Sequence, residues 1–323
     1  MLDILRLKSV IYVAAIQYLH AEKFIIIPLP GITNASGSCE SVSNIFTLDE
    51  SEFLTLSQTA QLQLEEYICT RNIEKIATTN RSYRKDNKNW EKFDGRHLND
   101  FELLETEAKD KDLNWLLHHC EDLLKHIFIE VLNHANEIEL SKFQEKNIVQ
   151  HLQKGFHIVE YSQAIKDLKL KYGEDLTNFH EQKLILLYDR NLFVINYPEK
   201  IKFFNMKISD KYRSDWEKNA ETTVDCVDVL LRYSGESIGG SVREYSQKII
   251  ENRLFNGIMF TQLQDLYQKK YKTSHIESAQ MISKMFENYL NLFTNKTIHR
   301  AGMGLGFGRV AQFITCADNI VHF

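Results

Sequence analysis

The stretch that decides the fold is Cys226–Glu244, which reads CVDVLLRYSGESIGGSVRE. Cys226–Leu231 is a mostly apolar run typical of a buried strand. Gly235 follows a short turn, and Glu236–Val242 predicts a second strand that contains two glycines. Sequential strands of this kind, in a chain that also has long helical stretches, favour an α+β fold. We therefore expect a mainly antiparallel sheet flanked by helices.

Hydrophobic periodicity predicts further strands and helices on both sides of this stretch. Phe24–Ile27 is a dense apolar run that Pro28 and Pro30 close, and it reads as a short strand. Further predicted strands cover residues 75–83, 98–107, 192–195 and 302–309. The predicted helices cover the N-terminal residues up to Lys23, and then residues 58–68, 113–135, 245–251, 274–292 and 310–316. Residues 184–197 mix both patterns.

The composition limits the class of protein. The chain has 323 residues, is 43% hydrophobic and carries a net charge of −5, so it can bury a large core and is no basic nucleic-acid coat. The five cysteines stand far apart, which favours free thiols in a reducing cytoplasm over zinc ligands or disulfides. Val10–Ile16 is apolar but far shorter than the roughly 20 residues of a membrane span. We interpret it as part of an amphipathic helix rather than a signal peptide.

Two carboxylates in the opening stretch suggest a metal site. Asp228 and Glu236 stand eight positions apart at neighbouring strand ends, where their oxygens can hold Mg²⁺ against phosphates. Glycines between them let a ligand approach the backbone, and Arg243 can pair with a substrate carboxylate. The alternative is a glycine-bulged strand with charges on its surface.

A charged loop between two predicted strands suggests a nucleotide clamp. Tyr83–Asp86 ends the first strand and His97–Glu105 starts the second. An arginine on one arm, Arg84, can neutralise a phosphate, and a phenylalanine on the other, Phe101, can stack on a base. The alternative is a solvated hairpin whose phenylalanine belongs to the core.

Ala301–Arg309, AGMGLGFGR, forms a third unusual segment. It is no phosphate-binding Walker loop, because no Gly-Lys-Ser/Thr follows, and the chain ends too soon for a dinucleotide fingerprint. It reads as a glycine strand that ends in Arg309 at a helix start, where the arginine can contact a base or a terminal phosphate. A glycine-lined packing strand is the alternative.

Taken together and in this order, the segments resemble the three signature motifs of class II aminoacyl-tRNA synthetases, and more narrowly the catalytic core of asparaginyl-tRNA synthetase. The resemblance covers nearly the whole chain. The matching segments are Phe24–Thr33 (end of motif 1), Leu54–Glu65, Tyr83–Glu105 (motif 2), Cys226–Glu244 and His299–Ile320 (motif 3).

The resemblance implies ATP as a substrate and assigns five residues to it. Arg84 resembles the motif 2 arginine that contacts the α-phosphate and the substrate carboxylate. Asp86 stands where the family has a glutamate near the adenine, and His97 matches a histidine beside the phosphates. Phe101 resembles the aromatic residue that stacks on adenine, and Arg309 the arginine on the adenine's other face.

The resemblance also implies a Mg²⁺ site and an amino-acid pocket. Asp228 and Glu236 resemble the carboxylates that hold Mg²⁺ with ATP. Glu105 and Arg243 resemble residues of the amino-acid pocket, and Gln61 lies on the pocket's other wall.

Several features depart from the family pattern. The chain starts at the core helix, so we expect one catalytic domain over residues 1–323 without the anticodon-binding β-barrel. Arg300 stands at a family histidine, His299 at a proline and Phe293 at an arginine. Gly308 replaces the acidic residue that precedes Arg309.

Three functions remain open at this point. The first is an ATP-dependent, AMP-forming ligase that activates aspartate, asparagine or a related small amino acid and transfers it to ammonia or an amine. This would resemble the stand-alone asparagine synthetases related to asparaginyl-tRNA synthetase. The second is charging of tRNA or another carrier, and the third is a non-catalytic regulator that binds amino acid or ATP. Motif 1 further implies a homodimer through Leu5–Pro30, and we expect a cytoplasmic protein with no membrane segment.

Overall fold

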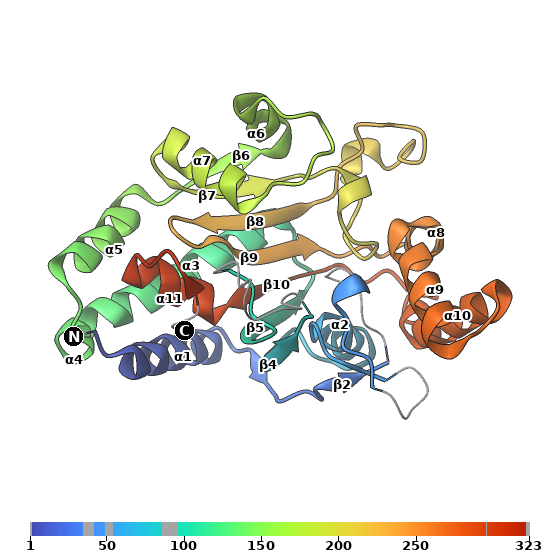
Figure 1. Ribbon diagram of the computed structural model, residues 1–323, viewed down its shortest axis with the longest axis horizontal. Coiled ribbons are helices and arrows are strands. Elements are labelled where there is room, and N and C mark those ends of the chain that lie inside the picture. The colour runs from blue at the N-terminus through green and yellow to red at the C-terminus, as the bar shows by residue number, and fades with distance from the viewer. Residues whose placement is uncertain (1, 35–41, 49–53, 86–95, 295, 321–323) are drawn as a thin grey trace.

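The computed structural model describes residues 2–34, 42–48, 54–85, 96–294 and 296–320. Its described residues form an eight-stranded sheet with the order β1-β4-β5-β10-β9-β8-β7-β6, and a small second sheet of β2 and β3 (Figure 1). The strands are β1 (Ile25–Ile26), β2 (Ile32–Thr33), β3 (Thr55–Leu56), β4 (Lys75–Tyr83), β5 (Asp100–Lys109), β6 (Phe156–Glu160), β7 (Asn191–Ile195), β8 (Cys226–Leu231), β9 (Gly235–Val242) and β10 (Arg300–Gly306).

Two hairpins build the centre of the large sheet. β4 and β5 pair antiparallel from Lys75↔Ala108 to Tyr83↔Asp100, and β8 and β9 form the second antiparallel pair. β10 lies between the hairpins and is antiparallel to both β5 and β9. Only the outermost described pairings of this sheet, β1 with β4 and β6 with β7, are parallel. The predicted α+β class with a mainly antiparallel sheet is confirmed.

Helices cover the sheet on both sides. The α-helices are α1 (Ile4–Ala21), α2 (Gln61–Thr70), α3 (Leu113–Asn133), α4 (Ala135–Ile138), α5 (Lys142–Lys154), α6 (Tyr161–Leu168), α7 (Asn178–Tyr188), α8 (Gln247–Asn256), α9 (Ile258–Tyr271), α10 (His275–Asn291) and α11 (Phe307–Thr315). Short 3-10 turns lie at Val42–Asn44, Glu199–Ile201 and Asp210–Tyr212.

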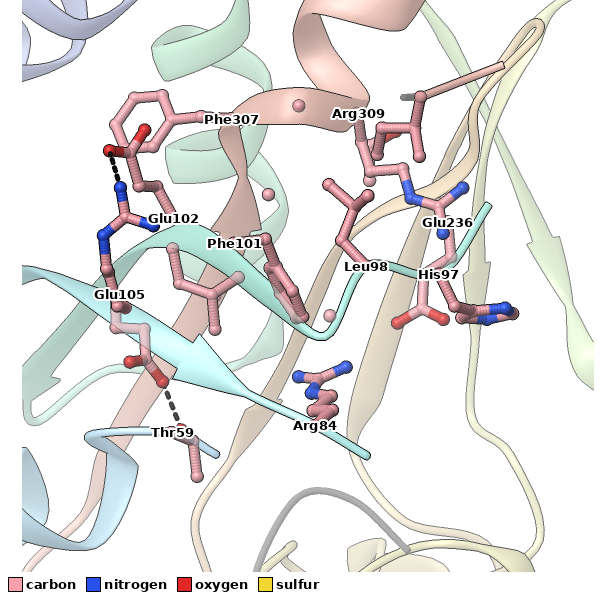
Figure 2. Close-up of a pocket in the computed structure, with 18 of the residues that line it drawn as sticks. Thr59, Arg84, His97, Leu98, Phe101, Glu102, Glu105, Glu236, Phe307 and Arg309 are labelled. Carbon is pink, nitrogen blue, oxygen red and sulfur yellow. Dashed lines mark hydrogen bonds and ion pairs between the residues drawn. The ribbon is translucent and has the colours of Figure 1, made fainter. Parts of the chain in front are cut away.

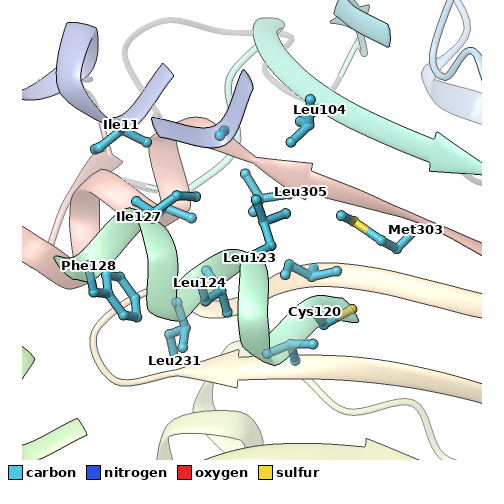
Figure 3. Packing of buried hydrophobic residues seen from close by; sticks show 14 of the residues in the cluster. Ile11, Leu104, Cys120, Leu123, Leu124, Ile127, Phe128, Leu231, Met303 and Leu305 are labelled. Carbon is cyan, nitrogen blue, oxygen red and sulfur yellow. The ribbon is translucent and has the colours of Figure 1, made fainter. Parts of the chain in front are cut away.

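The main core lies between α3 and the sheet. Leu123 and Leu124 of α3 are fully buried, and they pack with Met303 and Leu305 of β10 (Figure 3). Ile11 closes this core from α1, which packs along α3. Each such side chain contributes about 1.5–3 kcal/mol by leaving water, so this cluster holds the central strands rigidly in place.

A second core joins α8, α9 and α10 into a unit at one end of the molecule (Figure 1). Fully buried Ile250, Leu263 and Phe286 come from the three helices in turn, and Phe204 packs against them from the loop after β7. This unit stands next to the end of the sheet at which β10 begins, so it supports residues at that end.

The predicted elements agree with the structure in most places. The predicted strands at residues 75–83 and 226–231 match β4 and β8 at both ends, and the N-terminal apolar run lies within the amphipathic α1. The prediction of a strand up to Arg309 is wrong, because β10 ends at Gly306 and Arg309 lies in the first turn of α11. No helix among the described residues combines the length and apolarity that crossing a bilayer requires.

Candidate active site

A cavity of about 450 Å³ opens on the face of the sheet opposite α3. Glycines of the two central strands line it, among them Gly239 and Gly304. A Cβ at Gly239 would lie 2.9 Å from Glu236 Oε1 and would displace that carboxylate in the cavity. The predicted site residues that line the cavity are Gln61, Arg84, His97, Phe101, Glu105, Asp228, Glu236, Arg243 and Arg309. The remaining one, Asp86, lies outside the described residues.

Arg84 and Phe101 meet at one end of the cavity (Figure 2). They extend from the ends of β4 and β5, which the backbone bond from Arg84 N to Asn99 O (2.9 Å) holds together. The Arg84 guanidinium lies over the Phe101 ring, with Cζ 4.7 Å from the ring centroid. A flat aromatic face and a guanidinium in contact suit a base and its phosphates.

Arg309 reaches the cavity from the first turn of α11. Its Nη1 donates to the carbonyl of Ser234 (2.9 Å) and its Nη2 to the carbonyl of Arg96 (3.0 Å). These bonds fix the guanidinium against the turn that joins β8 to β9. The Arg309 guanidinium is therefore held rigidly at the start of α11, where the sequence predicts its contact with the nucleotide.

Arg96 and Glu181 form a layer behind Glu236 that the sequence did not reveal. Arg96 Nη2 lies 3.1 Å from Glu181 Oε2, and the same carboxylate oxygen accepts the backbone N–H of Glu236 at 2.9 Å. Glu181 is buried, whereas the Glu236 side chain is exposed. The pair thus fixes the backbone of Glu236 and leaves its carboxylate on the cavity side.

Asp228 has a cationic neighbour that the sequence analysis missed. Lys202 Nζ lies 2.8 Å from Asp228 Oδ2 and 3.9 Å from the centroid of the Tyr197 ring. Burial alone would lower the pKa of Lys202, but the Asp228 carboxylate raises it above its ordinary value. Lys202 therefore stands as a protonated amine beside one of the two predicted metal ligands.

The donor chemistry of Asp228 and Glu236 still suits Mg²⁺. They supply carboxylate oxygens from paired strands, where Asp228 is opposite Gly239 and Glu236 is opposite Leu230. The described residues contain no group of three or more metal-ligating side chains. A Mg²⁺ ion held here would need oxygens from a bound phosphate as well.

Glu105 lies on the other side of the cavity from Arg309 and Glu236 (Figure 2). Its carboxylate accepts hydrogen bonds from the Thr59 hydroxyl and from the backbone N–H of Ala60 (2.8 Å), at the start of α2. Burial raises the pKa of Glu105, and these hydrogen bonds oppose the rise. An anchored carboxylate at this depth can accept a substrate ammonium group.

Arg243 and Gln61 share a buried carboxylate, Glu107. Arg243 Nη2 lies 3.2 Å from Glu107 Oε2, and Gln61 Nε2 donates to the same oxygen at 3.2 Å. Burial raises the pKa of Glu107 to about 7; Arg243 opposes this rise and the nearby Glu65 carboxylate adds to it. Glu107 follows Glu105 by two positions on β5, so the alternation of the strand could have indicated it.

The family comparison fits this geometry. Residues 1–322 match the family model described as tRNA synthetases class II (D, K and N). The chain belongs to this family.

The class II synthetases most similar to the chain include several asparagine–tRNA ligases. The chain is 31% identical over 353 residues to the enzyme of Wigglesworthia glossinidia brevipalpis, which covers 98% of the chain and 67% of the relative. It is 29% identical over 304 residues to the enzyme of Blochmanniella floridana, covering 89% of the chain and 56% of that relative. The chain thus spans between about half and two thirds of these relatives' length.

Solved class II synthetases share the fold. The asparaginyl-tRNA synthetase of Pyrococcus horikoshii, in complex with asparaginyl-adenylate, superposes with a TM-score of 0.78 at 25% identity. The alignment covers 98% of this chain and 66% of that one. The Entamoeba histolytica asparaginyl-tRNA synthetase has a TM-score of 0.74 at 23% identity and covers 98% and 65%, which supports the fold.

Two of the residues that depart from the synthetase pattern contact each other. The Arg300 guanidinium lies over the Phe293 ring, with Cζ 4.6 Å from the centroid, and both side chains are buried. Gly308 instead lines the cavity next to Arg309. The unusual Phe293 and Arg300 therefore form one local feature rather than two independent changes.

Proposed function

We propose that this protein activates the carboxylate of aspartate, asparagine or a related small amino acid with ATP, forming an aminoacyl-adenylate. One observation carries the proposal. A single cavity combines a guanidinium on an aromatic face, Arg84 on Phe101, with the anchored carboxylate of Glu105. Family membership and the superposition on a synthetase that binds asparaginyl-adenylate support it.

The chemistry needs positioning and charge neutralisation more than covalent help. A carboxylate oxygen of the amino acid attacks the α-phosphorus of ATP. The bond from this phosphorus to the oxygen that bridges the α- and β-phosphates breaks, and pyrophosphate leaves with the bonding electrons. Arg84 neutralises the charge that develops on the α-phosphate, and His97 and Arg309 hold the phosphates and the base. Glu105 binds the substrate ammonium group.

Mg²⁺, when bound, would neutralise further charge on the phosphates. Asp228 and Glu236 would hold it, with Lys202 as a second positive charge beside Asp228.

The acceptor of the acyl group separates two candidate functions. In the first, ammonia or a small amine attacks the acyl carbonyl, AMP leaves and an amide forms. The charged loop between Arg84 and His97 supports this candidate. The resemblance implies that this loop of motif 2 meets the tRNA acceptor end, and here it mixes Lys85, Lys88 and Lys92 with Asp86 and Glu91 instead of being strongly basic. In the second, the acceptor is tRNA, as the names of the relatives suggest. A cytoplasmic location suits both candidates and stays a prediction.

ATP–pyrophosphate exchange tests the shared first step. The protein is incubated with Mg²⁺, ATP and labelled pyrophosphate, without tRNA, against a panel of aspartate, asparagine and related amino acids. Exchange that depends on one amino acid supports the proposal and identifies the substrate. Ammonia, amines or total tRNA are then added; a new amide by mass spectrometry, or charged tRNA on an acid gel, identifies the acceptor. Calorimetric binding of ATP or amino acid without exchange would instead indicate a regulator. The absence of both binding and exchange would refute the proposal.

A further inference from the structure

The amino-acid end of the cavity rests on a layer of buried charged side chains. Gln61 and Arg243 line the cavity, and Glu65, Glu107 and Arg300 lie behind them with no exposed surface. Gln61 Nε2 donates to Glu65 Oε1 at 3.1 Å and to Glu107 Oε2 at 3.2 Å, so it links the two carboxylates. The layer holds two carboxylates and two guanidinium groups.

Arg300 is fully buried, and all three of its guanidinium nitrogens donate hydrogen bonds. Its Nε and Nη2 both donate to Glu65 Oε2, the first at 3.0 Å. Its Nη1 donates to the carbonyl oxygens of Glu244 (3.2 Å) and Ile298 (3.1 Å), while the Phe293 ring covers its face. A planar guanidinium with five donors fits such an enclosed position, which an imidazole or an ammonium could not fill in the same way.

Glu65 is saturated by these contacts. Its Oε2 also accepts the Tyr289 hydroxyl at 2.7 Å, and its Oε1 also accepts Asn205 Nδ2 at 2.9 Å. Burial alone would raise the pKa of Glu65, but Arg300 and then Arg243 hold it below its usual range. Arg243 Nε stands only 4.0 Å from Glu65 Oε1, although Arg243 pairs with Glu107. Arg243 thus lies within 4.0 Å of both carboxylates, while Arg300 is the counter-charge nearest to Glu65.

We propose that Arg300 is a positioning residue for amino-acid recognition. By pairing with Glu65 behind the cavity, it keeps Arg243 on Glu107 and keeps Gln61 between the two carboxylates. Arg243 and Gln61 then both face the substrate side chain. Without Arg300, the buried Glu65 carboxylate lacks its main counter-charge and draws Arg243 away from the cavity wall. The proposal rests on the proposed function, since it takes this end of the cavity as the place where the amino acid binds.

Isothermal titration calorimetry on four proteins tests the proposal: the unaltered chain, Arg300→Met, the double variant Glu65→Gln/Arg300→Met, and Lys207→Met. Lys207 is a matched control, because it is a buried cation whose Nζ lies 2.8 Å from the Asp225 carboxylate, and it does not line the cavity. Asparagine and aspartate are titrated separately, and the one that binds the unaltered chain more tightly is followed. ATP is titrated in parallel.

Arg300→Met should weaken amino-acid binding at least about tenfold and leave ATP binding within about twofold, since the loss lies at the amino-acid end. The double variant removes both charges and should recover most of the affinity, and Lys207→Met should bind like the unaltered chain. If Arg300 served folding alone, Arg300→Met would lower the melting temperature. It would not weaken amino-acid binding more than ATP binding, and the double variant would not regain amino-acid affinity. If Arg300→Met does not fold, Arg300→Lys and the double variant carry the comparison, with intermediate affinity expected for Arg300→Lys.

Unchanged amino-acid affinity in Arg300→Met, equal losses for ATP and amino acid, or a double variant no better than the single one would each overturn the inference. So would an unaltered chain that binds neither amino acid. The proposed function fails separately, when the amino acid binds but supports no pyrophosphate exchange.

Discussion

At the scale of single residues, the contact between Arg84 and Phe101 brings together two side chains to which the proposed function gives different parts of the nucleotide. The Arg84 guanidinium covers one face of Phe101, the ring on which a base is expected to stack. A cation over an aromatic ring is worth about 0.5–1 kcal/mol at an exposed site, so a base can compete for the ring at little cost. Arg84 can then turn to the phosphates, where its charge has a larger effect.

Arg84→Ala should lower ATP–pyrophosphate exchange by at least about a hundredfold, which is the usual effect of losing one group that stabilises transition-state charge. The melting temperature should stay close to that of the unaltered protein, because Arg84 lies at the cavity and not in a core cluster. Arg71→Ala, at the exposed end of α2, serves as the control. A variant that loses its circular dichroism signal along with its activity would show that Arg84 is structural instead.

The sequence predicts individual residues well where the signal is local. Asp228, Glu236 and Arg243 fall within one hairpin, and the structure places all three at the same cavity. The pair of Glu65 and Arg300 could not be predicted in this way, because 235 positions separate the two residues and only the completed fold brings them together. Lys202 was missed for a similar reason. It stands in the loop after β7 and meets Asp228 of β8 only once the chain has folded.

At the scale of elements, α3 carries a buried histidine that makes packing dependent on pH. His119 stacks between Trp115 (centroids 4.8 Å apart) and Phe24 (5.2 Å), and its Nε2 lies 3.3 Å from Thr106 Oγ1. Burial lowers the pKa of His119 to about 3 from an ordinary 6.5, with a smaller contribution from Lys75. The folded protein therefore keeps this imidazole neutral.

His119 should make the fold less stable as the pH falls. Between pH 6.5 and pH 3 the unfolded chain binds a proton at this position that the folded chain does not, so the stability contributed by His119 is lost as the pH falls through this window. His119→Phe keeps a ring between Trp115 and Phe24 but cannot titrate. Urea unfolding should show that the unaltered protein loses about 2 kcal/mol more than His119→Phe between about pH 7 and pH 5. Equal losses in both proteins would contradict a buried neutral imidazole.

Elements with strong periodicity could be predicted, and those with weak periodicity could not. β4 was predicted at both ends because it pairs along its whole length inside the sheet. β6 was missed because it is a short edge strand whose sequence, FHIVE, leaves most side chains outside the core. α9 was missed because it buries few residues and follows α8 directly across Gly257. The C-terminal glycine run looked like one strand because glycines carry no side-chain pattern that would mark where β10 gives way to α11.

At the scale of the whole molecule, the N-terminal segment leaves apolar side chains uncovered. Leu5 and Val13 of α1, Ile25 of β1 and Ile32 of β2 are all about half exposed or more. Leu5, Val13 and Ile25 belong to Leu5–Pro30, the segment that the family resemblance assigns to a two-fold interface, and Ile32 lies two positions beyond it. Apolar groups gathered in this way favour burial against a second copy.

We therefore predict a dimer at micromolar concentration, measured by light scattering. Leu5→Arg/Val13→Arg should shift the mass to that of a monomer, because two charges would be buried against each other in a symmetric contact. Ile276→Arg changes an isoleucine on α10 whose exposed fraction, 70%, lies between those of Leu5 and Val13, and it should leave the dimer intact. A monomer in the unaltered protein would refute the prediction, and dissociation by both variants would show that the interface lies elsewhere.

The place of β10 in the sheet also has a consequence for how the chain folds. β4 and β5, and likewise β8 and β9, are close in sequence, so each hairpin can form early from its own segment. β10 pairs with β5 at positions nearly two hundred residues away, such as Gly304 with Glu105. Until it enters, β5 and β9 each expose an open strand edge, the kind of surface on which chains aggregate. β10, whose glycines line the cavity, is thus also the strand that joins the two halves of the sheet. We expect the step in which β10 pairs to be slow and to depend on protein concentration during refolding.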